Sequence, residues 1–309
     1  MARERVEAWP GKFWFVIAVR IRRAARRVAI GVPLASIMSA CITLTALPRA
    51  VETADGRIDV RSLPCTSVAE DLAPWPLSAP RLDPAAIRVL TWNIHKEDDA
   101  GWRQDLSRLT ADSDIVLLQE ATLGPLLLEI LDHARMRFVM ASSFLYAETD
   151  VGVLTAARVA PRASCTERAI EPWLRLPKSA VVSWFALWGT RQTLAVANIH
   201  AINFSTVEAY RAQLAALVAA LSKHDGPIVF AGDFNTWTEA REETFRATAA
   251  ALGLREIAYA DDRRALFFGR PLDHILVRGL AVVDAMAIPV QSSDHNPIWA
   301  TLRLDPPPR

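Results

Sequence analysis

The apolar run from Pro227 to Ala231 constrains the fold more than any other part of this sequence, because Gly232, Asp233 and Asn235 follow it directly. A short apolar run bounded by glycine is typical of a buried strand, and a helical pattern with threonine caps follows it. Side chains two residues apart in an extended segment point the same way, so Asp233 and Asn235 project together from the strand's carboxyl end. The same residues would also suit an ordinary turn. A functional site here therefore needs polar side chains from other strands.

Two earlier apolar runs end in the same manner. The first, Ile87 to Ile94, carries Asn93 and ends at His95. The second, Asp114 to Gln119, ends in Glu120 and is apolar enough for a strand buried on both faces. A carboxylate at the end of a buried strand needs a partner or a metal ion, so Glu120 is a metal-ligand candidate. A solvated glutamate at a strand end is the alternative.

Three later segments place further polar side chains at expected strand ends. Ligands of α/β sheets bind at the carboxyl edge of the strands, so we expect these side chains to share one site. The segments are 193–199 with Asn198 and His200, 271–277 with Asp273 and His274, and 292–297 with Asp294 and His295 before a closing strand at 298–302.

The alternation of these strands with helical patterns predicts an α/β domain. Asp98 and Asp99 are expected to cap a short helix, and Ser205 with Glu208 forms a capping box before another. Further helices are expected over 126–133 and about 239–252, and further strands over 139–143, 151–156 and 179–187.

The N-terminal segment 1–49 has nine basic and two acidic residues, and its apolar stretch 28–47 contains no charged residue. Twenty such residues are about the span of a bilayer core, and arginines before them would hold that end in the cytoplasm. The pattern predicts a signal anchor or a signal peptide. The rest of the chain would then be membrane-anchored or exported, on the extracytoplasmic side. A buried helix in a cytoplasmic protein is the alternative.

Residues 50–86 are rich in proline and are expected to form a linker or an extended arm, whereas the globular pattern covers 87–305. Cys65 and Cys165 lie outside the apolar segment and would be free to pair in an exported protein. Their connectivity does not follow from the sequence. The cysteines and histidines also lack the spacing of a zinc site.

Charge and residue types limit the chemistry. From residue 50 onward the chain has 26 basic and 32 acidic residues, so its overall charge does not favour nucleic-acid binding, although a local basic groove stays open. Carboxylate and amide oxygens suit Mg²⁺ or Mn²⁺. A hard ion beside histidine suits hydrolysis of a phosphate ester, in which a carboxylate or histidine activates water.

Six short motifs carry a resemblance to a known family. In order and approximate spacing they resemble the endonuclease/exonuclease/phosphatase superfamily, which includes DNase I-like nucleases, inositol polyphosphate 5-phosphatases and bacterial sphingomyelinases. The likeness is closer to its YafD-like bacterial branch. It implies a four-layer α/β/β/α sandwich of two mixed β-sheets. The motifs are Thr91 to His95, Leu118 to Glu120, Asn198 to His200, Gly232 to Asn235, Leu272 to His274 and Ser293 to Pro297.

The resemblance also implies a Mg²⁺ site, with Mn²⁺ as an alternative ion. Glu120 would be the main ligand, assisted by Asn93 and Asp294. His95 stands where other members have aspartate, so the likeness assigns it no metal role. His274 is expected to be a neighbour of the site.

The remaining implied roles are catalytic. Asp233 would orient or deprotonate the attacking water, and Asn235 would hold a phosphate oxygen. His295, oriented by Asp273, would act as general base or as a hydrogen-bond donor in the transition state. His200 would bond to the phosphate or to the leaving side.

Three functions remain open at this stage. The first is a Mg²⁺-dependent phosphodiesterase or endonuclease acting on nucleic acid, which needs basic residues beside the site, as the 162–178 region offers. The second is a membrane-associated enzyme acting on a phospholipid or small phosphoester, which needs an exposed apolar loop such as Trp173 and Leu174 or Phe267 and Phe268. The third is an inactive, membrane-tethered binding domain. No protein partner is inferred.

Overall fold

The computed structural model describes residues 42–45, 48–54, 57–67, 75–76 and 78–306, all within one compact unit, Ile42–Arg309. The predicted signal anchor or signal peptide therefore lies mostly outside the described residues. Its last part contributes strand β1 (Ile42–Thr43), which pairs with the end of β6. No helix among the described residues has the length and apolar character needed to cross a membrane.

A nine-stranded mixed sheet forms one half of the unit, in the order β16-β17-β4-β5-β7-β6-β2-β3, with β1 added beside β6. β4 and β5 are parallel, and the other pairs are antiparallel. Its strands are β1, β2 (Arg49–Ala54), β3 (Arg57–Arg61), β4 (Ile87–Asn93), β5 (Ile115–Thr122), β6 (Arg137–Tyr146), β7 (Thr149–Ala157), β16 (Leu280–Ala287) and β17 (Ile298–Leu304).

A six-stranded mixed sheet forms the other half, in the order β12-β15-β11-β10-β9-β8. Only the β10 and β11 pair is parallel among these described strands. The strands are β8 (Ala163–Ile170), β9 (Pro177–Ala186), β10 (Thr193–His200), β11 (Ile228–Asp233), β12 (Arg255–Glu256) and β15 (Asp273–Arg278), while β13 (Leu266–Phe267) and β14 (Arg270–Pro271) form a separate hairpin.

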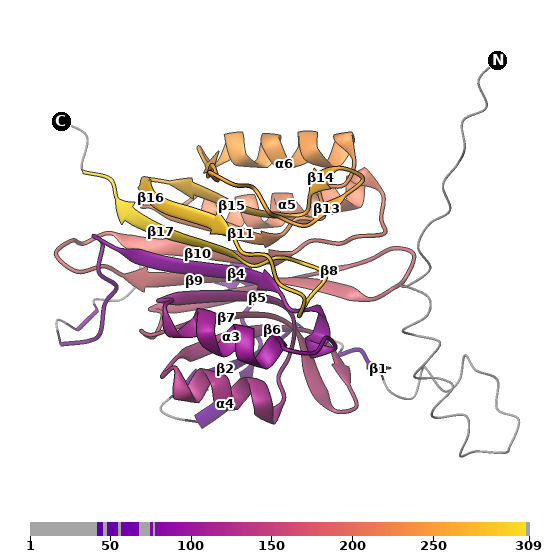
Figure 1. Ribbon diagram of the computed structural model, residues 1–309, viewed down its shortest axis with the longest axis horizontal. Coiled ribbons are helices and arrows are strands. Elements are labelled where there is room, and N and C mark those ends of the chain that lie inside the picture. Colours follow the sequence, from indigo (N-terminus) through magenta and orange to yellow (C-terminus); the bar gives the residue numbers. More distant parts are fainter. Residues whose placement is uncertain (1–41, 46–47, 55–56, 68–74, 77, 307–309) are drawn as a thin grey trace, which may run out of the picture. The chain divides into compact units, whose positions relative to one another are not determined.

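The sheets pack face to face and helices cover their outer faces, as Figure 1 shows. Each strand contributes to two apolar cores, because successive residues of a strand point to opposite faces of its sheet. Val89 and Leu117 enter the core between the sheets, whereas Leu90 and Leu118 pack under helices. The predicted four-layer α/β/β/α sandwich is confirmed. The helices are α3 (Trp102–Ala111) and α4 (Pro125–His133) on the nine-stranded sheet, and α5 (Val207–Leu221) and α6 (Glu239–Ala251) on the six-stranded one.

Some local structure differs from the sequence-based expectation. Residues 50–54 and 57–61, expected within a linker or arm, belong to the paired strands β2 and β3 and extend the large sheet. Helix α3 begins only at Trp102, after Gly101 and without a side-chain cap, and Asp99 instead bonds to His95. Thr206, the residue after Ser205, caps α5 by accepting from the backbone of Ala209.

Two cysteines join distant parts of the unit. Cys65, in a short 3₁₀ helix (Cys65–Ser67), forms a disulfide with Cys165 on β8, across 100 residues of sequence. A cross-link over so long a loop removes conformational freedom from the unfolded chain. The pairing that the sequence left open is thus made in the structure.

Replacing Cys65 with serine is expected to lower the free energy of unfolding by about 5 kcal/mol, the magnitude of the chain-entropy term for such a loop. Urea denaturation followed by circular dichroism would measure it, with Cys41→Ser as control. A similar midpoint for wild type, Cys65→Ser and reduced wild type would contradict the expectation.

Gly232 lies where β11 approaches β10 most closely. Its φ of +135° is a conformation that side chains rarely adopt, and a Cβ atom there would lie 2.1 Å from the carbonyl oxygen of Ile199. No backbone atom can remain at that distance from a carbon. Glycine therefore allows the pairing that sets Asp233 beside His200.

Gly232→Ala is expected to cost about 3 kcal/mol or more, because the two strands must separate. Gly189→Ala is the matched control, since it also has a positive φ but no atom within 4 Å of an added Cβ. That control should cost only about 1 kcal/mol. Equal thermal destabilisation of the two variants would show that the close approach is unimportant.

Candidate active site

The predicted polar residues come together where several strands end. Neighbouring parallel strands deliver their last residues to one edge, which is the ordinary ligand-binding edge of such sheets. The two sheets each contribute. Asn93 ends β4, Glu120 lies near the end of β5, His200 ends β10, Asp233 ends β11, Asp273 begins β15, and Asp294 and His295 precede β17.

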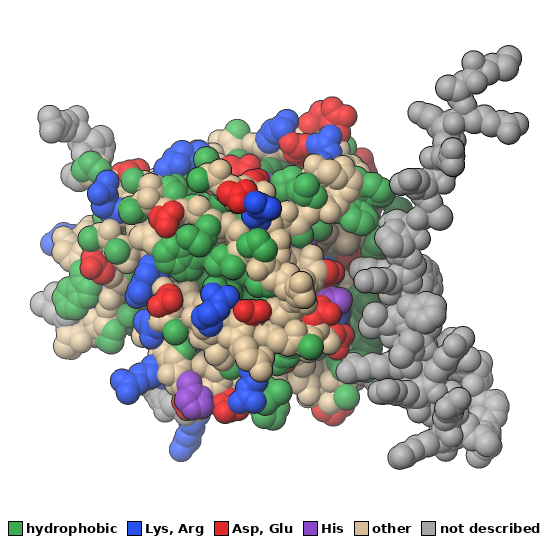
Figure 2. Space-filling model, in the orientation of Figure 1, with side chains coloured by type: hydrophobic (Ala, Val, Ile, Leu, Met, Phe, Trp, Pro, Cys, Tyr) green, Lys and Arg blue, Asp and Glu red, His purple; other side chains and the backbone are tan. Residues whose placement is uncertain are grey.

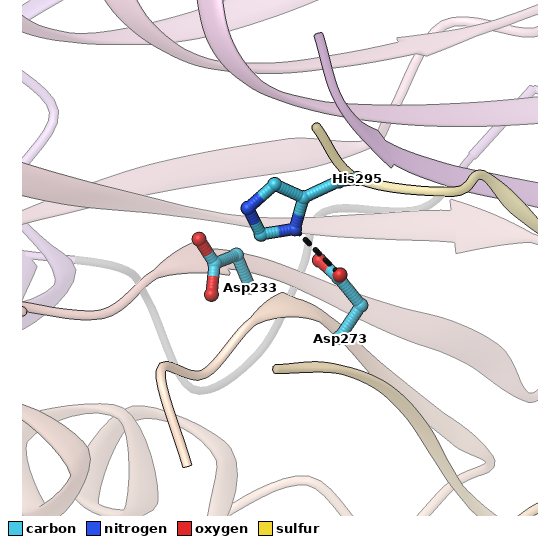
Figure 3. Close-up of side chains that lie close together, drawn as sticks. All are labelled: Asp233, Asp273 and His295. Atoms are coloured by element: carbon cyan, nitrogen blue, oxygen red, sulfur yellow. Dashed lines mark hydrogen bonds and ion pairs between the residues drawn. The ribbon is translucent and has the colours of Figure 1, made fainter. Parts of the chain in front are cut away.

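Asp273 and His295 form a buried pair, shown in Figure 3. Nδ1 of His295 donates to Oδ2 of Asp273 at 2.6 Å. Trp92 Nε1 donates to the His295 carbonyl oxygen at 3.0 Å, which fixes the loop that carries the imidazole. Burial lowers the pKa of His295, but the charges of Asp273 and Asp233 outweigh it and raise this pKa to about 10. The imidazole is therefore protonated at neutral pH.

Asp233 lies on the other side of this imidazole in Figure 3. Its carboxylate accepts from Asn93 Nδ2 at 3.1 Å and from the backbone of Asn235 at 3.0 Å. Burial raises the pKa of Asp233, and the nearby charge of Asp273 raises it further, although the charge of His295 opposes this shift. The carboxylate is thus poised to accept a proton nearer to neutral pH than an ordinary aspartate.

Glu120 sits between two lysines. Lys96 Nζ bonds to its Oε2, and Lys178 Nζ donates to its Oε1 at 3.3 Å. Burial alone would raise the pKa of Glu120, but the charges of Lys96 and Lys178 hold it well below its usual value. Its backbone has a φ of +53° at a register shift in β5, which turns the side chain out of the strand's regular alternation.

His200 lies beside Lys178, Glu120 and Asp233. Lys178 Nζ donates to Nε2 of His200 at 2.9 Å, and the same nitrogen lies 3.3 Å from Asp233 Oδ2. Burial and the positive charge of Lys178 hold the pKa of His200 well below its usual value. His200 is therefore neutral where His295 is charged.

The backbone from His95 to Glu97 carries the first of these lysines to the site. Three successive residues have positive φ values, of 46°, 55° and 64°. Such conformations are costly for residues other than glycine, and they cluster at functional sites. The amide of His95 donates to Asn93 Oδ1, which anchors the segment beside Asp233.

The structure separates the predicted residues into two groups. Asn93, Glu120, His200, Asp233 and the Asp273–His295 pair are joined by direct contacts. Other predicted residues lie at the margin. Asn235 donates its amide to the Ala201 carbonyl, Asp294 has a half-exposed side chain 3.9 Å from His95, and His274 turns away to Thr236 and Glu256.

Lys96 is the site residue that the sequence reasoning passed over. Its signal was present, since it directly follows the motif that ends in His95. Lys178 lies in the 162–178 region, which the sequence analysis offered only as a source of basic residues beside the site. The contact of both ammonium groups with Glu120 depends on a chain path that no spacing rule describes.

The donor atoms suit a hard divalent cation. Ligand atoms of Asp233, Asp273 and His295 lie within 4.8 Å of one another. Oδ1 of Asp273 is buried and has no hydrogen-bond partner among the described residues, so it has a lone pair to offer. Oxygen atoms dominate the set, which is the preference of Mg²⁺ and Mn²⁺. The oxygen donors present therefore fit such an ion, whereas the protonated imidazole of His295 has no lone pair to offer it.

The sandwich and its acidic, histidine-containing edge define the class as a phosphoesterase of DNase I-like fold. The chain belongs to the endonuclease/exonuclease/phosphatase family, whose family model matches residues 90–295. A UPF0294 protein of Vibrio parahaemolyticus is 39% identical over 225 residues, which cover 72% of this chain and 80% of that protein. One from Photorhabdus laumondii is 40% identical over 213 residues, 69% of this chain and 82% of that protein.

Solved structures share the fold at low identity. The human Nocturnin catalytic domain with bound sulfate has a TM-score of 0.57 and 20% identity, and the likeness covers 73% of this chain and 96% of that one. ANGEL2, described as a 2′,3′-cyclic phosphatase in complex with adenosine-2′,3′-vanadate, has a TM-score of 0.57 and 15% identity, over 74% and 98% of the two chains. At these identities the likeness shows the fold alone.

Asp273→Asn is expected to lower the pKa of His295 from about 10, because it removes the nearest negative charge while keeping the shape of the side chain. NMR titration of the imidazole Cε1 proton in EDTA would measure this shift, with His295→Gln to assign the signal. An unchanged pKa would mean that Asp273 does not hold the imidazole charged.

Proposed function

We propose that this protein is a divalent-metal-dependent phosphodiesterase that hydrolyses a P–O bond by attack of water. The observation that carries the proposal is the placement of Asp233 within 4.8 Å of the bonded Asp273–His295 pair, with a third carboxylate, Glu120, reached through His200. Groups whose surroundings push their pKa values apart are the usual acid and base of one reaction. Family membership supports phosphate-ester chemistry in general.

Asp233 is the residue suited to take a proton from the attacking water, because its raised pKa brings it towards working pH. His295 is already protonated, so it serves better as a hydrogen-bond donor to the phosphoryl oxygens in the transition state than as a base. Asp273 keeps this imidazolium oriented through its bond to Nδ1. Of the two roles that the sequence left open for His295, the proposed reaction uses that of hydrogen-bond donor.

Glu120 and Asn93, with Asp294 at the rim, would hold Mg²⁺ or Mn²⁺. When bound, such an ion offsets negative charge on the phosphoryl oxygens. Lys96 and Lys178 keep Glu120 ionised and add positive charge beside the place where a phosphate would bind. Asn235 keeps one amide hydrogen for a phosphate oxygen after its bond to Ala201.

The location of the protein is a separate proposal. We infer that the described unit works outside the cytoplasm, held by or released from the N-terminal segment 1–49. The disulfide between Cys65 and Cys165 supports this, because disulfides persist in oxidising compartments.

A nucleic-acid phosphodiester is the first substrate candidate. Figure 2 displays basic and acidic side chains interspersed on the face drawn there. From the 162–178 region, Lys178 lies at the site and Arg175 is exposed near it, while Arg168 bonds to Thr45. Shielding of many phosphates would need more cations than these. A phospholipid is the second candidate, favoured by two exposed apolar loop tips beside the site.

Asp233→Ala is expected to lower kcat on bis(p-nitrophenyl) phosphate by about 10²–10⁴-fold, as loss of a general base does. EDTA should abolish turnover, and Mg²⁺ or Mn²⁺ should restore it. The exposed Asp284→Ala, on β16, is the matched control. Circular dichroism should show both variants folded.

The same proteins incubated with supercoiled plasmid would separate the substrate candidates. Nicking that needs both the metal and Asp233 would establish a nuclease. Hydrolysis of the soluble diester without nicking would leave the phospholipid. Full turnover in folded Asp233→Ala would refute the proposed reaction.

A further inference from the structure

Two loops beside the catalytic edge end in exposed apolar side chains. The loop between β8 and β9 presents Trp173, whose exposed fraction is 67%, and Leu174. The β13–β14 hairpin presents Leu266 and, at its tip, Phe268, whose exposed fraction is 72%. Single exposed apolar residues are ordinary, but two large pairs on neighbouring loops indicate an interaction surface. We call these four residues the apolar rim.

Hydrogen bonds hold the base of the loop that carries Trp173 and Leu174. Glu171 is buried at the base of the first loop, where its backbone amide donates to Leu176 at 3.0 Å and its carbonyl accepts from Arg175 at 2.8 Å. The loop is thus closed below Trp173.

The hairpin tip also holds an aromatic residue where sequence preference would not put one. Phe268 and Gly269 have φ values of 51° and 76°, the signs of a two-residue hairpin turn that favours Asn-Gly. A bulky residue with positive φ is uncommon and costly. A costly backbone conformation at a residue with an exposed aromatic ring is typical of a functional position.

The two loops are joined to each other through Trp237. Its ring lies 6.1 Å from that of Phe267, and its Nε1 donates to Asn203 Oδ1 at 2.8 Å. The backbone N–H of Asn203 in turn donates to Glu171 Oε1 at 2.6 Å. The two loops that carry the rim are therefore linked, and Figure 1 places β8, β13 and β14 towards the same side.

Each loop of the rim also leads towards a strand that carries a site residue. Lys178 lies four residues after Leu174, and Asp273 lies five after Phe268. The described chain enters at the same edge, because Ile42 pairs with Tyr146 at the far end of β6, and the register through β7 sets that end beside Thr122 on β5. The apolar stretch 28–47, predicted as a membrane segment, includes this point, since β1 is formed by its last part.

We propose that the apolar rim docks on the surface of a phospholipid bilayer, so that the catalytic edge faces the headgroup layer. Tryptophan and phenylalanine beside an arginine suit this interface, since aromatic rings settle at headgroup level and cations meet anionic lipids. Arg175 supplies that cation next to Leu174. A chain that leaves towards the membrane from the same edge would favour this orientation.

The test uses the full chain with vesicles of phosphatidylethanolamine and phosphatidylglycerol whose acyl chains carry bromine, which quenches nearby tryptophan. Trp173→Phe should remove a distinct part of the quenching. The matched control is Trp188→Phe: this side chain is 52% exposed and follows the opposite end of β9. It should change the quenching little.

Phe268→Ser should reduce the part of the quenching that depends on Trp173, while turnover of the soluble diester stays at the wild-type level. Equal effects of Trp173→Phe and Trp188→Phe would overturn the proposal. Protection of Trp173 from acrylamide by plasmid DNA, but not by vesicles, would overturn it in favour of a nucleic-acid surface. The quenching needs no turnover, so an inactive enzyme would refute the proposed reaction without deciding the docking surface.

Discussion

A pair of buried amides holds the two sheets together directly beneath the site. Gln119 on β5 donates to Asn198 Oδ1 on β10 at 2.7 Å, and Asn198 donates to the Leu154 carbonyl at 2.9 Å. Both amides are fully buried, so breaking the pair would leave polar atoms without partners, at about 1–3 kcal/mol each. Glu120 follows one amide and His200 lies two residues beyond the other. The relative position of the two half-sites therefore depends on this pair.

The site built on that pair contains two opposite electrostatic environments. Burial and the charge of Asp273 raise the pKa of Asp233. The charges of Asp273 and Asp233 raise the pKa of His295 and keep it protonated. Around Glu120, two lysines favour ionisation in spite of burial. Positive backbone φ values at Glu120 and at His95 to Glu97 accompany this arrangement. A proton acceptor, a proton-bearing donor and an ionised carboxylate can thus coexist in one site.

The parts of the fold that could be predicted are those in which the residues of a single strand indicate how that strand is buried. Strands β5, β10 and β11 are apolar on both faces, so their runs and their polar ends were recognisable. Strands β8 and β16 lie at or near sheet edges with mixed burial and no clear period of two, and they were not predicted. The hairpin β2–β3 was not predicted, because it precedes a proline-rich stretch and is stabilised by pairing with the distant strand β6.

The sequence by itself determined the α/β class, the residue types of the site and the order in which the strands deliver them, because local periodicity and composition encode these features. Only the tertiary structure decided that Lys96 and Lys178 meet at Glu120, that Cys65 pairs with Cys165, and that the loops carrying Trp173 and Phe268 are linked through Trp237. Those contacts join residues separated by up to 100 positions. They follow from sheet register and loop closure, which no single segment of the chain specifies.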